Sequence, residues 1–82
     1  MMSKSIKVSY FALFREKTGK SEELVTTDAE TAIDLFRELE DCHGFNEPYG
    51  HCKVAINNDL AEWSNTIKDG DTVLFFPPVS GG

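Results

Sequence analysis

A chain of 82 residues forms one small domain, and such a domain buries only roughly 60% of the surface that its unfolded chain exposes. This length excludes a deep cleft between two domains and disfavours a self-contained enzyme. Fourteen acidic and eight basic residues give a formal net charge of −6, which disfavours nucleic acid and anionic membranes as partners and suits a partner with a basic face.

The first half of the chain predicts two strands and one helix. Residues 6–14 open with apolar and polar side chains in alternation, which predicts a strand, and residues 22–26 predict a second strand that pairs with it across the charged turn 15–21. Thr27–Glu30 fits a capping box, and a helix of about 13 residues is expected to follow and to end at Gly44. Its apolar stripe is predicted at Ala29, Ala32, Ile33, Phe36 and Leu39.

The second half predicts three further strands joined by turns. These strands are expected at residues 51–57, 60–63 and 72–76. Asn57-Asn58-Asp59 and Asp69-Gly70-Asp71 are typical turn sequences, and Pro77-Pro78 ends the last strand because proline cannot donate a ladder hydrogen bond. The order β-β-α-β-β-β predicts one α+β domain over residues 1–82, with a mixed sheet and one helix on one of its faces.

Two of the predicted strands carry apolar side chains on both faces. The inward set of the first strand is Ile6, Val8, Tyr10 and Ala12. Phe11 and Leu13 then point outward, as do Leu74 and Phe76 of the last strand. Because one helix covers one face only, these side chains predict an exposed patch that binds a partner. The alternative is that the strand ends twist and tuck them under a loop.

The carboxyl-terminal segment is the other candidate site. Pro77-Pro78 holds the chain extended, and the side-chain-free Gly81 and Gly82 suit a narrow channel. An unhindered terminal carboxylate can be activated as an acyl adenylate and then attacked by a nucleophile. The alternative is a frayed end that carries two glycines by chance.

Two segments carry a resemblance to a known family. Residues 69–82, DGDTVLFFPPVSGG, resemble the DGD-x-V-x-FFPPV-x-GG ending of the small, sulfur-carrying subunit of molybdopterin synthase. Residues 10–19, YFALFREKTG, are similar to the FFA-x-x-RE-x-x-G opening of that family. The resemblance covers nearly the whole chain, and it implies the ubiquitin-like β-grasp fold, with about five strands and one main helix.

The resemblance implies a sulfur carrier rather than a catalyst. An ATP-dependent adenylyltransferase of the ubiquitin-activating type would adenylate Gly82, and a sulfur donor would convert it to a thiocarboxylate. The tail would then enter the large synthase subunit, where sulfur passes to cyclic pyranopterin monophosphate and forms the molybdopterin dithiolene. The residues of the tail that would thread into that subunit are Pro77, Pro78, Val79, Ser80 and Gly81.

The resemblance also implies the contacts and the setting of the carrier. Phe11, Leu60 and Phe76 correspond to the hydrophobic docking positions of the family. No cofactor or metal would be bound, and ATP would be used by the activating partner. A cytoplasmic heterotetramer of two small and two large subunits is expected.

Three rival interpretations remain open. A ubiquitin-like protein modifier would join Gly82 to lysines of other proteins, and a thiamine-pathway sulfur carrier is a relative whose ending usually lacks the FFPPV run. A binding module with an inert tail is the third. Cys42-His43 and His51-Cys52 do not have the spacing of a zinc site, because adjacent ligands seldom reach one metal.

Overall fold

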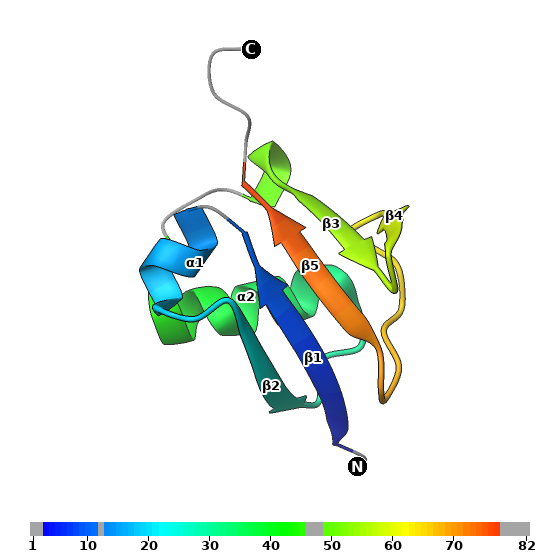
Figure 1. The fold of residues 1–82 in the computed structure, drawn as a ribbon. Coiled ribbons are helices and arrows are strands. Elements are labelled where there is room, and N and C mark those ends of the chain that lie inside the picture. Colours follow the sequence, from blue (N-terminus) through cyan, green and yellow to red (C-terminus); the bar gives the residue numbers. More distant parts are fainter. Residues whose placement is uncertain (1–2, 12, 46–48, 78–82) are drawn as a thin grey trace.

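One mixed sheet with a helix across one face makes up the domain in a computed structural model that describes residues 3–11, 13–45 and 49–77 (Figure 1). The strand order is β2-β1-β5-β3-β4; β1 and β5 are parallel, and the other neighbours are antiparallel. The strands are β1 (Lys4–Tyr10), β2 (Glu22–Thr27), β3 (Lys53–Ile56), β4 (Asp59–Ala61) and β5 (Thr72–Phe76). The helices are α1 (Leu13–Thr18), α2 (Ala32–His43) and the 3-10 turn η1 (Tyr49–His51). The predicted fold class is confirmed.

The connection between β1 and β2 differs from the prediction. The first strand ends at Tyr10, and the short helix α1 follows where a continued strand and a turn were expected. A tertiary contact explains the helix, because it allows Phe14 to be fully buried, with its ring centroid 4.8 Å from that of Phe45. Gly19 ends the helix at a φ of 75°, a left-handed conformation that favours glycine. The predicted inward position of Ala12 and the side chain of Leu13 lie outside the described residues.

Helix α2 begins later than predicted. Thr31 is its N-cap, and the Thr31 hydroxyl accepts a hydrogen bond from the backbone N–H of Asp34 at 3.4 Å. The Thr27 hydroxyl instead accepts from the N–H of Ala29 at 3.0 Å and closes a turn before the helix. The predicted end is confirmed, because Gly44 caps the helix in the left-handed conformation, with a φ of 64°.

The core lies between α2 and the inner face of the sheet. Four of the five predicted stripe residues are buried, whereas Ile33 is only partly so and the unpredicted Leu35 is fully buried. Trp63 stacks on Phe75 with 5.8 Å between the ring centroids and donates its indole N–H to the Cys52 carbonyl at 3.3 Å, which places it at the edge of the core. The turn between β3 and β4 contains two left-handed residues, Asn57 and Asn58, as its sequence predicts.

A polar cluster joins β1, β2 and the end of α2. The Tyr10 hydroxyl donates to Glu23 Oε1 at 2.7 Å, His43 Nε2 lies 3.2 Å from the same oxygen, and Lys20 Nζ lies 3.2 Å from Oε2. The bond from Tyr10 lowers the pKa of the Glu23 carboxyl. Burial, followed by the bond to Glu23, raises the pKa of the Tyr10 phenol. The folded state therefore favours ionised Glu23 beside neutral Tyr10.

Replacing Tyr10 by Phe should lower the free energy of unfolding by about 1–2 kcal/mol at neutral pH, because a partly buried hydrogen bond to a charged group is lost. Stabilisation through Glu23 is present above its ordinary pKa of 4.5 and is lost as pH falls through the lowered folded pKa. Stabilisation through Tyr10 is present below its ordinary pKa of 10.0 and is lost as pH rises toward the raised folded value. Urea unfolding at acid, neutral and alkaline pH measures both effects.

The matched control for Tyr10→Phe is Tyr49→Phe, the same chemical change at an exposed tyrosine. The control should leave stability within about 0.5 kcal/mol of the wild type, as is usual for surface substitutions. A Tyr10→Phe variant with the wild-type pH profile would show that the hydrogen bond to Glu23 does not stabilise the fold.

Candidate docking face and carboxyl terminus

The face of the sheet opposite α2 carries an aromatic pair at the carboxyl end of β5. Phe75 is buried toward α2, so the next residue, Phe76, points to the outer face, where it is half-buried. Phe11 follows the end of the neighbouring strand β1 and is 54% exposed. The two ring centroids lie 6.0 Å apart with an interplanar angle of 62°, an edge-to-face contact. The predicted outward placement of both residues is confirmed, and Phe11 is not tucked under a loop.

The strand register connects Leu60 to this pair through Leu74, which lies two residues before Phe76 in β5 and on the same face. Ala55 of β3 lies opposite Leu60 on one side and opposite Leu74 on the other, so these three residues form a cross-strand row. Leu60 is 74% exposed, whereas Ala55 is buried. Ala55 nevertheless belongs to the outer face, because its neighbours Val54 and Ile56 pack against the core on the inner face. We call these residues the outer patch: Phe11, Ala55, Leu60, Leu74 and Phe76.

The sequence pattern alone did not reveal the contribution of Ala55. An alanine in a short strand carries no periodicity signal, and only the register of β3 between β4 and β5 places it between Leu60 and Leu74. The contribution of Ala55 could be found only by pairing residues 53–56 with residues 73–76 in antiparallel register.

The predicted reactive tail begins where the outer patch ends. Phe76 is the last residue of β5, and the half-buried Pro77 follows it directly. The remaining predicted tail residues lie outside the described part of the chain: Pro78, Val79, Ser80, Gly81 and Gly82. Five residues span at most about 18 Å when fully extended.

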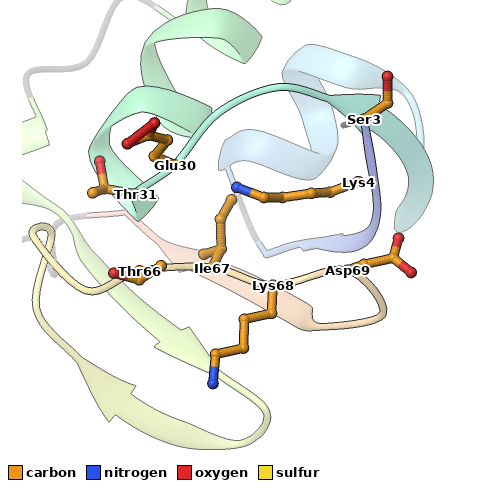
Figure 2. A pocket seen from close by; sticks show the side chains of 8 residues that line it. All are labelled: Ser3, Lys4, Glu30, Thr31, Thr66, Ile67, Lys68 and Asp69. Carbon is orange, nitrogen blue, oxygen red and sulfur yellow. The ribbon is translucent and has the colours of Figure 1, made fainter. Parts of the chain in front are cut away.

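A pocket of about 590 Å³ lies at the other end of the sheet, where β1 and β5 begin (Figure 2). Its polar groups support the fold: Lys4 Nζ donates to the Ala29 carbonyl at 2.6 Å, and Asp69 Oδ1 accepts from the backbone N–H of Ser5 at 2.7 Å. Figure 2 shows the Lys4 side chain running across the pocket and Lys68 pointing away from it. None of the residues that line it was predicted as a functional residue.

The two cysteines lie in different surroundings. Cys42 is exposed on α2, and Cys52 is buried just before β3. In the part of the chain that the structure describes, no three His, Cys, Asp or Glu side chains are grouped so that they could hold a metal ion. Within the same residues, no helix combines the length and apolar character needed to cross a membrane.

Known proteins with similar sequences include carriers of the kind that the tail suggests. The molybdopterin synthase sulfur carrier subunit of Escherichia coli (strain K12) is 35% identical over 80 residues, which cover 94% of this chain and 99% of that protein. The chain is thus similar to this carrier over nearly its full length.

Solved structures confirm the ubiquitin-like β-grasp fold. SAMP1 of Haloferax volcanii, a small archaeal modifier protein, superposes with a TM-score of 0.78 at 30% identity, covering 95% of this chain and 99% of its own. A complex of subunits 1 and 2 of molybdopterin-converting factor from Helicobacter pylori contains a chain with a TM-score of 0.63 at 29% identity, covering 95% of this chain and 99% of its own. The similarity therefore spans both carriers and modifiers.

The family assignment rests on the whole domain rather than on the tail alone. The ThiS family model matches residues 8–82, from the middle of β1 through the outer patch to the last glycine. Together with the identity to the carrier subunits, this match shows that the chain belongs to the ThiS family.

Proposed function

We propose that this chain is the sulfur carrier subunit of molybdopterin synthase and that Gly82 carries the sulfur. The observation that best supports this role is the junction at Phe76 and Pro77, where an exposed apolar patch meets the start of the tail. A carrier needs both parts, because the patch holds the domain on its partner while the tail delivers its end to the active site. The full-length similarity to carrier subunits supports the same role.

The sulfur enters in two steps. Adenylation by an ATP-dependent partner joins the Gly82 carboxylate to AMP and releases pyrophosphate. A sulfur nucleophile from a donor then displaces AMP and leaves a thiocarboxylate. The sulfur of each thiocarboxylate forms a bond to a carbon of cyclic pyranopterin monophosphate, and water then cleaves the acyl–sulfur bond and restores the Gly82 carboxylate, so the two sulfurs of the dithiolene use two carriers.

The acid-base chemistry of the transfer is assigned to the large subunit. The outer patch supplies apolar and aromatic surface of the kind that forms the centre of protein interfaces. The related chain from Helicobacter pylori occurs in a complex with subunit 2, which supports a large subunit as the partner. Since the five residues after Pro77 span at most about 18 Å, the active site of that subunit lies within about this distance of the docked Pro77. We propose two small and two large subunits, assembled in the cytoplasm.

A protein modifier is the second candidate, and the similarity to SAMP1 favours it. Both functions start from the same adenylate of Gly82. They diverge in the attacking group, which is sulfur for a carrier and a lysine amine for a modifier.

Intact-mass measurement after incubation with the activating enzyme, ATP and a sulfur source separates the two functions. A carrier should gain the mass difference of one oxygen-to-sulfur exchange, and subsequent addition of the large subunit and the pyranopterin should restore the original mass while molybdopterin forms. Isopeptide adducts on lysines with no thiocarboxylate would instead support the modifier. An unchanged mass under all conditions would contradict both.

A further inference from the structure

A lysine borders the outer patch beside its aromatic pair. Lys53 is the first residue of β3, it is exposed, and the register places it directly opposite Phe76 of β5. Because Val54 and Ile56 pack against the core, Lys53 and Ala55 both point to the outer face. The ammonium group of Lys53 is therefore carried on the same face as the apolar side chains that a partner would cover.

The charge of Lys53 is not balanced within the described part of the chain. Lys7 also lies on this face of the sheet, and its Nζ forms an ion pair with Glu22 Oε1 at 3.6 Å. Lys53 and Glu62 line the same shallow pocket of about 280 Å³, yet Lys53 forms no ion pair with Glu62 or with any other described residue. A partner that covers Phe76 takes water away from this ammonium group, which is unfavourable unless the partner supplies a hydrogen-bonding anion.

We propose that the large subunit presents an Asp or Glu carboxylate to Lys53, next to the apolar surface that covers Phe76. This inference rests on the proposed function, and it adds the chemistry of the partner's surface. The net charge of −6 draws the chain toward a basic surface at long range, whereas Lys53 and its carboxylate fix the register of the docked complex at short range. A second copy of this chain is the weaker occupant, because two chains of charge −6 repel each other and self-pairing of the patch brings two lysines to one interface.

Binding measurements with the large subunit of the same organism test the pair. Lys53→Met keeps the length of the side chain and removes the charge; it should weaken binding by about fivefold, the upper range for an exposed ion pair, and should reduce the dependence of affinity on salt. Lys53→Glu places like charges together and should weaken binding on the order of 100-fold. Lys68→Glu makes the same charge change at the opposite end of the sheet and should bind like the wild type.

A zero-length cross-link identifies the partner group. A carbodiimide activates a carboxylate, a neighbouring amine attacks the activated carbonyl, and a urea leaves as the amide forms. Peptide mapping of the treated complex should find Lys53 joined to an Asp or Glu of the large subunit, and the Lys53→Met variant should lack this product.

Three outcomes would overturn the inference. Equal or tighter binding by Lys53→Met would show that no carboxylate faces the lysine. A cross-link from Lys53 to a second copy of this chain, together with a dimer in sedimentation of the chain alone, would show that the partner of Lys53 is another copy and not the large subunit. Unchanged binding of all Lys53 variants, with binding lost in Phe76→Asp, would reject the carboxylate but keep the docking role of the outer patch. Binding retained in Phe76→Asp as well would contradict that docking role itself.

Discussion

Deletion of Gly82 should abolish sulfur transfer while the domain stays folded. The activated carboxyl must reach a fixed point in the partner, and a misplacement of about 1 Å can lower a rate 100-fold, whereas loss of a whole residue moves the carboxyl by about 3.3 Å or more. No residue after Phe75 belongs to the described core, so the free energy of unfolding should change by less than about 0.5 kcal/mol. Molybdopterin formation in a reconstituted assay and urea unfolding are the two measurements.

Two variants make the result specific to the position of the carboxyl group. A chain with one alanine added after Gly82 should also lose sulfur transfer, because its terminal carboxyl group then lies beyond the reacting position in the partner. Gly81→Trp should slow transfer by crowding the path of the tail. The deletion variant should still bind the large subunit through the outer patch and compete with the wild type. Molybdopterin formation at the wild-type rate by the shortened chain would contradict the sulfur-carrier role.

Phe76→Asp should weaken binding to the large subunit by at least about 30-fold and leave the fold intact. Truncating a central interface aromatic already costs about 2 kcal/mol or more, and a charge in the desolvated centre adds to that loss. Phe11→Asp should have a similar but smaller effect, because Phe11 is more exposed and contacts Phe76 only at one edge. Titration calorimetry measures the affinity, and circular dichroism confirms the fold.

The chain contains a close control for this prediction. Leu60 and Leu24 are both 74% exposed, and both lie in edge strands of the sheet. Leu60 belongs to the outer patch, whereas Leu24 lies opposite Lys7 at the far edge. Leu60→Asp should therefore weaken binding, and Leu24→Asp should not. Equal effects of the two substitutions would show that the large subunit does not recognise the outer patch.

The sequence by itself determined the elements whose local signals agree with their surroundings. The last strand was predicted at its observed bounds, because a short run of apolar residues lies between a turn and two prolines. The end of α2 followed from Gly44, since a left-handed cap favours glycine whatever packs nearby. The outward placement of Phe11 and Phe76 followed from a period of two and from a single helix, which can cover one face only.

Only the tertiary structure decided the features that depend on distant contacts. Residues 13–18 form a helix, although the local pattern predicts a strand through residue 14 and a turn over residues 15–21, because burial of Phe14 against Phe45 outweighs that pattern. The helix α2 has its N-cap at Thr31 rather than starting at Thr27 or Asp28. The residues before it bond instead to the loop that precedes β5, as in the 3.0 Å bond from the Ile67 N–H to the Glu30 carbonyl.

The composition of the outer patch was likewise decided by the tertiary structure. Local periodicity reports which side of its own strand a residue occupies, but the register between strands determines which residues become neighbours. That register places Leu60 beside Ala55, which carries no periodicity signal of its own. It also places Lys53 beside Phe76, which is far from it in the sequence. The nature of the tail could be read from the chain alone, whereas the surface that would present it to a partner required the fold.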